Sequence, residues 1–405
     1  MLSRRTFLAT GAAALGAPLG GSPLFARHRV GAIAGSSFDP WLEIDADALA
    51  HNARTVALLA GGRPIIAVVK NNAYGLGLET AGPILDRLPE IQSFAVVRAD
   101  EALTLRRAGV RKAILLMGPA SEDDLMELAP HDVIHSLHLA NALETFARVA
   151  ERLRHPVRVQ VYVDTGMHRM GIPHTAAIPS IQTLAATNAV RIEGAFTELV
   201  EDPDFDREQA RRLRTLQSDA RAKGVVIGPL HAASSDAVMH GTSDAFLDAV
   251  RPGLALYGGY VSDRAMARGE LRPSFSLKAR VIRVDHVAAG EGVSYHRRWS
   301  TDRPAWTATL AVGHVDGYPS GATKGCEVLV RGRLFPVIGT VSASHTVIHL
   351  GETQAADVGD EATLVGREHA ALHPNEVAKR AGWSEYNMFM HLSPRLRRLV
   401  RSGSQ

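Results

Sequence analysis

A lysine at the end of a strongly apolar segment is the residue around which chemistry in this chain can be organised. Residues 65–69 are apolar and almost all β-branched, which predicts a strand buried on both faces, as in parallel sheets. Lys70 closes this segment, and a turn containing Tyr74 and Gly75 follows at once. Such a lysine either marks the point where a strand meets water or forms a Schiff base in a partly desolvated site. A phosphate site and a second proton-transfer group elsewhere in the chain would favour the Schiff base.

The segments that must position Lys70 alternate between strand and helix. We predict strands at 64–69, 93–98, 112–117, 132–137, 157–163, 191–197, 228–233 and 249–257. Amphipathic helical stretches separate them, and eight such strands indicate a (β/α)8 TIM barrel. A doubly wound open sheet is the alternative, but no glycine-rich dinucleotide turn follows the first strand. A further strand is expected at 41–45, before a helix from Asp47 to Ala60.

The pattern changes near residue 273, where strands with period-two alternation and short turns replace the helices. With 405 residues, the chain is also too long for one ordinary core. We therefore expect a barrel domain at 41–272 and a mostly-β C-terminal domain at 273–405, with one helix near 375–381.

The first residues have the pattern of a targeting signal. Arg4 and Arg5 precede a short apolar run at 8–19, and a cleavage site ending in a small residue is expected at 24–26. We therefore predict a twin-arginine signal peptide over residues 1–26 and a linker over 27–40. This signal predicts export of the folded protein to the periplasm or the outside. No other stretch is long and apolar enough to span a membrane, so no span is expected in the mature chain.

Composition excludes some partners. The net charge of +3 is small for this length, and no basic stripe with interleaved aromatic residues is present, so nucleic acid is not an expected partner. Cys326 is the single cysteine, which rules out an internal disulfide. No metal site is expected.

Chemistry in a barrel gathers at the carboxyl ends of the strands, and the last two strands commonly bind phosphate. Ser235 and Gly253 suit a phosphate site, because a hydroxyl and backbone N–H groups are the usual donors. The polar residues that the alternation places at this end are Lys70, Arg169, Glu198, Ser234, Ser235 and Arg251.

Five ungapped motifs resemble those of alanine racemase and its relatives, in the order of that family. They are AVVKNNAYG at 67–75, DTGMHRMG at 164–171, VRPGLALYG at 250–258, VSY at 293–295 and VDGYP at 315–319. The resemblance covers about residues 41–397 and implies a fold-type III pyridoxal 5′-phosphate (PLP) enzyme that racemises amino acids.

By this resemblance, Lys70 holds PLP as a Schiff base, Arg169 contacts its phenolic oxygen and Arg251 its pyridine nitrogen. Arginine does not give up its proton, so it donates a hydrogen bond to the ring without protonating it. A neutral pyridine is a weaker electron sink, which suits the exchange of one proton between two faces of Cα. The residues that the resemblance assigns to the phosphate are Tyr74, Ser235, Gly253 and Tyr386.

Proton exchange between two faces needs two bases. Lys70 is one, and the resemblance assigns the other to Tyr295, supplied by the β-domain of a second subunit. A free phenol has a pKa near ~10, so a cationic neighbourhood must help it to act as a base. The resemblance therefore implies a homodimer with shared active sites.

Four positions depart from ordinary alanine racemases. Glu198 replaces a histidine, Ser234 an asparagine, His314 a tyrosine, and Ser342-Ala343-Ser344 a Cys-Met-Asp loop. Arg169, His314, Ala343 and Ser344 are the expected substrate contacts. An Ala-Ser pair in this loop is similar to exported broad-specificity amino-acid racemases, because the smaller side chain leaves room for longer substrates.

These departures leave alternatives to a broad-specificity racemase. One is alanine racemase proper. Another is a PLP-binding protein with little turnover, because a carboxylate at Glu198 would hinder the ionisation of Tyr295 unless it pairs with Arg251. A decarboxylase is disfavoured, since Tyr295 and the short β-domain match racemases.

Overall fold

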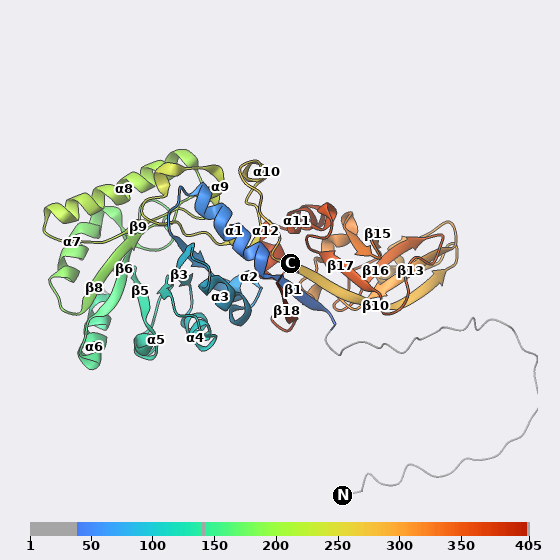
Figure 1. Cartoon of the computed structure of the whole chain (residues 1–405), viewed down its shortest axis with the longest axis horizontal. Helices are drawn as coiled ribbons and strands as arrows, with labels where there is room; N and C mark the ends of the chain where they lie inside the picture. Colours follow the sequence, from blue (N-terminus) through green and yellow to red (C-terminus); the bar gives the residue numbers. More distant parts are fainter. Residues whose placement is uncertain (1–38, 140–141, 403–405) are drawn as a thin grey trace, which may run out of the picture.

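The computed structural model describes residues 39–139 and 142–402. The predicted signal peptide, 1–26, and the linker up to residue 38 lie outside the described residues. Figure 1 shows two units, with the helices and parallel strands of the first on one side and the β-domain on the other. Within the described ranges, no helix is long and apolar enough to cross a membrane.

The first unit is the predicted barrel. Its parallel strands pair in the order β2-β3-β4-β5-β6-β8-β9, and a short β7 (Ile172–Pro173) pairs with β6. Two single-residue bridges, Ile65 with Val250 and His231 with Ala249, close the ring between β9 and β2. The ring strands are β2 (Ile65–Val68), β3 (Ile91–Val96), β4 (Ala113–Leu116), β5 (Val133–Leu137), β6 (Val157–Asp164), β8 (Val190–Phe196) and β9 (Leu230–His231).

Helices follow the strands and cover the outside of the ring (Figure 1). Their apolar faces are buried against the strands, as in the strongly amphipathic α6, whose Phe146, Val149 and Ala150 point inward. They are α3 (Leu78–Asp86), α4 (Ala99–Arg107), α5 (Glu122–Leu128), α6 (Leu143–Leu153), α7 (His174–Ala185), α8 (Pro203–Ala222), α9 (Ser235–His240) and α10 (Asp263–Met266).

The predicted eighth strand, 249–257, is wrong over most of its length. Only Ala249 and Val250 make strand bridges, and residues Leu254–Tyr257 form a 3-10 helix, η4. Pro252 has no N–H to continue a ladder. The next N–H, on Gly253, donates instead to the Ser235 side chain at 2.9 Å.

The second unit is the predicted β-domain. Its sheet runs in the order β13-β16-β15-β14-β17-β10-β1-β18, and β13 also pairs with β10, which closes six of these strands into a ring. The strands are β1 (Trp41–Asp45), β10 (Phe275–Val287), β13 (Ala305–Leu310), β14 (Glu327–Val330), β15 (Arg333–Ile338), β16 (Thr346–Gly351), β17 (Glu361–Val365) and β18 (Arg397–Arg401). Helices α11 (Pro374–Ala381) and α12 (Glu385–Met390) lie between β17 and β18 in the chain.

The strand at 41–45, which we grouped with the barrel, belongs to this second sheet. β1 lies antiparallel to β10 and parallel to β18, and all five of its residues are buried. A buried strand needs partners on both edges for its backbone groups, and these two strands supply them. Helix α1 (Ala46–Leu59), capped by Asp45, then leads into the barrel.

A buried ion network reinforces this arrangement. The Lys278 ammonium on β10 lies 3.1 Å from Glu43 on β1, 2.7 Å from Glu361 on β17 and 3.3 Å from Glu368. Three carboxylates around one ammonium hold that lysine in its protonated form. Lys278 is therefore occupied structurally and is a poor candidate for a Schiff base.

Candidate active site

The lysine turn has an unusual backbone. After β2 and Val69, residues Lys70–Tyr74 form the short turn α2, in which Asn71, Asn72 and Ala73 have φ of 53°, 58° and 53°. Tyr74 continues it with φ 52°. This left-handed turn places Lys70 and Tyr74 at the carboxyl end of β2, where the barrel was expected to carry its chemistry. The amine of Lys70 has no hydrogen-bond partner among the described residues.

Tyr74, Gly253 and Ser235 meet at the end of the ring where β9 and β2 are bridged. A Cβ at position 253 would lie 2.1 Å from the Tyr74 hydroxyl oxygen, so only glycine allows this approach. The Ser235 hydroxyl accepts hydrogen bonds from the N–H groups of Gly253 (2.9 Å) and Ala255 (3.1 Å). Its own O–H therefore remains available to donate to a ligand.

Two tyrosines face this corner. The ring of Tyr74 stacks on that of Tyr257 with centroids 4.8 Å apart, and the Tyr386 ring from α12 lies 6.5 Å from Tyr74. Burial raises the pKa of Tyr74 and of Tyr386 well above the ordinary phenol value. Neither hydroxyl has a hydrogen-bond partner among the described residues. Both are thus protonated donors, as a phosphate requires.

Arg251 shows most clearly what this site is built to hold. Its side chain is 2% exposed. Nη1 donates to His231 Nδ1 at 2.7 Å, and Nη2 donates to the Thr197 carbonyl at 2.9 Å and to Glu198 Oε2 at 3.0 Å. The Nε–H has no partner within the described part of the chain. The Nε–H is therefore left for an acceptor such as a ring nitrogen.

His231 fixes the direction of that arginine. Burial, and then the charge of Arg251, lower the pKa of His231 well below its usual value, so the ring is neutral. Nδ1 then accepts from Arg251, and Nε2–H donates to Gln160 Oε1 at 2.7 Å. Sequence analysis missed both residues. A signal was present for His231, which is the one polar side chain of the predicted strand 228–233, but Gln160 lies in a predicted strand that alternates apolar and polar residues.

Glu198 lies between the two arginines of the site. Its Oε2 is 3.0 Å from Arg251 Nη2 and 3.9 Å from Arg169 Nη2. Arg169 also hydrogen-bonds Tyr162, whose pKa is raised by burial and by Glu198. The sequence left open whether Glu198 hinders the ionisation of Tyr295 or pairs with Arg251. The structure shows the pairing with Arg251.

Tyr295 lies elsewhere. It begins η5 (Tyr295–Arg297), between β11 (Gly292–Val293) and β12 (Trp299–Ser300), and is 66% exposed. No hydrogen bond or ring contact joins it to a described residue of the barrel. The flanking residues Ser294 and His296 have φ of 67° and 60°, so the backbone here is also unfavourable for residues other than glycine.

The expected substrate loop lies on the same exposed ridge as Tyr295. We define the ridge as residues 294–297, 313–316 and 340–345. Ser294 Oγ donates to the Thr340 carbonyl at 3.2 Å, and the His314 N–H donates to the Ser342 carbonyl at 3.0 Å. His314, Ala343 and Ser344 are all exposed. One chain therefore carries two separate groups of expected site residues, one on the barrel and one on the ridge.

The barrel group fits the cofactor that the sequence predicts. It offers an amine on Lys70 and an Nε–H on Arg251 without partners among the described residues, and hydroxyl donors beside Gly253. By this fit, Lys70 would carry the cofactor, Arg251 and Arg169 would contact its ring, and the phosphate would lie among Tyr74, Ser235, Gly253 and Tyr386. Among the described residues, no cluster of three or more His, Cys, Asp or Glu side chains could hold a metal ion.

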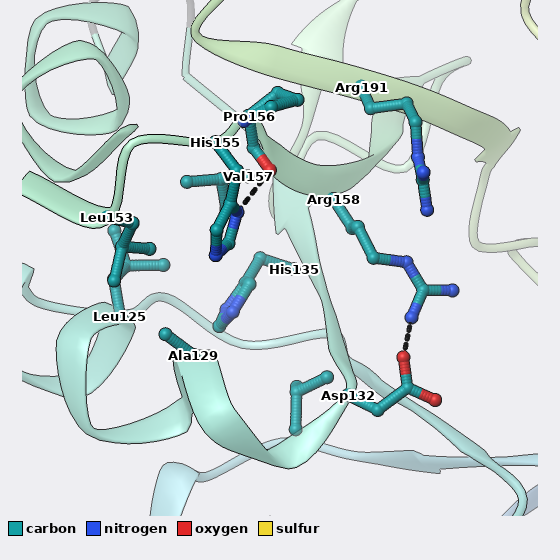
Figure 2. Close-up of a pocket in the computed structure, with 11 residues that line it drawn as sticks. Leu125, Ala129, Asp132, His135, Leu153, His155, Pro156, Val157, Arg158 and Arg191 are labelled. Carbon is teal, nitrogen blue, oxygen red and sulfur yellow. Dashed lines mark hydrogen bonds and ion pairs between the residues drawn. The ribbon is translucent and has the colours of Figure 1, made fainter. Parts of the chain in front are cut away.

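A pocket lies at the end of the barrel opposite to these residues (Figure 2). It is lined by the first residues of β5 and β6, including Val133 and Arg158, and by α5 and α6. His135 is buried there, and burial lowers its pKa to about 4. The charges of Arg158 are matched by Asp132 and Glu193. None of the expected site residues lines this pocket.

Comparison with known proteins agrees with this geometry. Residues 44–261 match the family model "Alanine racemase, N-terminal domain", and residues 274–400 match "Alanine racemase, C-terminal domain". The alanine racemase of Halorhodospira halophila is 34% identical over 358 residues, which cover 88% of this chain and 96% of the relative. "Alanine racemase 2" of Caldanaerobacter subterraneus subsp. tengcongensis is 30% identical over 367 residues, covering 88% and 94%. A solved alanine racemase structure from Clostridium difficile 630 has a TM-score of 0.84 at 26% identity, covering 91% of this chain and 97% of that one.

We expect Lys70 to be the lysine that carries the cofactor. The purified protein should be yellow, and borohydride should fix the cofactor to the peptide containing Lys70, as identified by mass spectrometry. Lys278 serves as an internal control, since three carboxylates hold it protonated. A label on Lys278 or Lys324 would show that the assignment is incorrect.

Proposed function

The chain belongs to the alanine racemase family of PLP enzymes, and on that basis we propose that it interconverts the L and D forms of several amino acids by two-base proton transfer at Cα. The observation that carries the proposal is the arrangement at Arg251, whose protein partners leave the Nε–H to face a ring acceptor. Exchange of the Cα proton of single L-amino acids in deuterated water tests it.

Each residue has a distinct part in this reaction. PLP supplies an electron-withdrawing ring that acidifies the Cα proton of an attached amino acid. Arg251 donates a hydrogen bond and keeps its own proton, which limits the withdrawal to what a simple proton swap needs. Lys70 accepts or returns the proton on one face, and Tyr295 of a second subunit serves the other. Arg169, 57% exposed at the side chain, is placed to meet a substrate carboxylate.

A shared active site is supported by the separation of the two groups of residues. Tyr295 is exposed on the ridge, while Lys70 lies on the barrel of the same chain. Val315 on the ridge is also 55% exposed, so the ridge offers an apolar side chain as well as Tyr295 to a partner subunit. We propose that a homodimer brings the ridge of one subunit to the barrel of the other.

We also propose that the protein is exported. The support is the twin-arginine pattern of residues 1–26 alone, which lies outside the described residues. Fusion of these residues to a reporter that is active only after export of a folded protein would test the proposal.

The shared site can be tested by mixing variants. Lys70→Ala and Tyr295→Phe should each be inactive alone, because each lacks one base. After subunit exchange, a statistical mixture should regain up to about a quarter of the wild-type sites, since one site of each mixed dimer keeps both bases. Activity is measured after exchange is proven by mass. Exchange without recovery would place both bases in one chain.

Broad specificity is supported by the small side chains of the ridge. Ala343 and Ser344 leave an exposed loop whose backbone is held by Val315, which donates to the Ala343 carbonyl at 3.1 Å. Because the loop is anchored by its backbone, a larger side chain at 343 would not displace the loop. It would instead fill the space that the small side chain of Ala343 leaves for a substrate. The narrower candidate, alanine racemase proper, requires that no longer substrate side chain enters this space.

We expect measurable racemisation of lysine, arginine or methionine. Ala343→Met should suppress these long substrates far more than alanine, because each extra buried methylene is worth roughly 0.8 kcal/mol and methionine would occupy its place. The ratio of kcat/KM for lysine to that for alanine measures this effect. Ala343→Ser, which keeps the volume small, is the control. Equal slowing of both substrates by Ala343→Met would favour the narrow specificity.

The remaining candidate is a cofactor-binding protein in which Glu198 disables the base. The pairing of Glu198 with Arg251 supports the active enzyme instead, because the carboxylate balances a buried guanidinium. A buried cation without a counter-charge is unfavourable. Glu198 therefore has a structural reason to be ionised where it lies.

One substitution should change kcat/KM in opposite directions for the active racemase and for the cofactor-binding protein with little turnover. Glu198→Gln should lower kcat/KM by about tenfold, because Arg251 loses the counter-charge that orients it. If Glu198 instead hinders Tyr295, the neutral side chain should raise the rate. Glu352→Gln, on an exposed ion pair with Arg303, is the matched control and should change kcat/KM little.

A further inference from the structure

The lysine turn is held in a conformation that its own residues disfavour. Four consecutive residues, Asn71 to Tyr74, have φ between 52° and 58°, and none is glycine. Left-handed backbone brings Cβ of an L-residue too close to the following carbonyl oxygen, so runs of such residues do not persist unaided. Something outside the turn must therefore stabilise it.

Glu101 makes the contacts that do so. It lies in the first turn of α4 and is 6% exposed. Its Oε1 accepts hydrogen bonds from the N–H groups of Asn71 at 2.6 Å and Asn72 at 3.4 Å. Its Oε2 accepts from Val97 at 3.1 Å and Arg98 at 3.3 Å. The carboxylate thus joins the lysine turn to the end of the neighbouring strand β3.

These hydrogen bonds satisfy a buried charge without an ion pair. No salt bridge involves Glu101 among the described residues, and the hydrogen bonds to its carboxylate all come from backbone N–H groups. Hydrogen bonds to an ionised acceptor are stronger than neutral ones, and a buried carboxylate cannot give them up to water. The hold on Asn71 and Asn72 is therefore firm.

A cation holds the other end of the turn. Arg398, on β18, donates from Nη2 to the Gly75 carbonyl at 2.7 Å and from Nε to the Leu76 carbonyl at 2.8 Å. The turn is thus held through its first N–H groups by an anion, and the carbonyls that directly follow it are held by a cation. Glu101 acts at the end nearer Lys70.

We propose that Glu101 is a positioning residue for catalysis, which holds residues 70–74 in the left-handed conformation and so sets the places of Lys70 and Tyr74 around the cofactor. This inference rests on Lys70 and Tyr74 having the roles assigned above. In this role Glu101 contacts neither substrate nor cofactor. It acts through the backbone of the turn.

The test begins with Glu101→Gln. Glutamine keeps the shape, but its NH2 group cannot accept, so one pair of N–H groups loses its acceptor. In the holoenzyme, amide hydrogen exchange should accelerate by roughly tenfold at Asn71 and Asn72 or at Val97 and Arg98, and the dissociation constant for PLP should rise by about as much. Glu79→Gln, an exposed glutamate that begins α3, should change neither.

A second substitution makes the test specific to the turn. Glycine adopts positive φ without a steric penalty, so Ala73→Gly should restore part of the PLP affinity to the Glu101→Gln protein, although it removes a buried methyl group. Restored folding by Ala73→Gly would give the same support if Glu101→Gln alone fails to fold. Unchanged exchange and affinity in Glu101→Gln, or no recovery in the double variant, would overturn the proposal.

The experiment also separates this proposal from the assignment of Lys70. Amide exchange at the turn reports the hold of Glu101 whichever lysine carries the cofactor. Borohydride labelling reports the lysine. Accelerated exchange with a label on another lysine would confirm the hold on the turn but refute its catalytic purpose.

Discussion

Closure of the barrel by a segment too short to be a strand is the constraint on which the site depends. Around Val250, the backbone exchanges hydrogen bonds with Pro64 and Ile66 on one side, and the Arg251 N–H donates to the Ala233 carbonyl on the other. These bonds complete the ring and leave little freedom to the residues that follow. Arg251 and Gly253 are therefore held by the same bonds that close the fold.

The parts of the site that follow from local pattern could be predicted from the sequence. The apolar run before Lys70 and the order of the barrel strands were predicted correctly, and membership of the alanine racemase family is confirmed. The predicted length of the eighth strand was wrong, because the chain turns at Pro252 and Gly253. The hydrogen bond from the Gly253 N–H to Ser235, which replaces a strand hydrogen bond there, could not be predicted from the sequence. The partners of β1 could not be predicted either, because pairing between the first and last strands leaves no periodic signal in either segment.

Backbone strain lies beside both expected bases. Left-handed residues follow Lys70, and others flank Tyr295. Such a backbone is unfavourable in free energy and persists only where surrounding contacts stabilise it. Glu101 and Arg398 supply these contacts in the barrel. In the ridge, Ser294 donates to the Thr340 carbonyl, and Gly339 leaves room for it, since a Cβ there would lie 2.7 Å from that of Ser294. Sequence patterns do not record such contacts, because the carboxylate of Glu101 and the turn that it holds lie 30 residues apart.

The position of β1 between β10 and β18 bears on how the molecule is made. During synthesis the first described strand leaves the ribosome early, yet one of its two partners, β18, is the last of the described strands to be translated. Residues 41–45 must therefore wait with one edge unpaired while the barrel and the rest of the β-domain are assembled. Arg398 lies on that same last strand and binds the carbonyls at the exit of the lysine turn. A nascent chain that stalls before β18 lacks both the edge partner of β1 and one of the two charges that hold the lysine turn. Completion of the sheet and completion of the lysine turn are therefore the same late event.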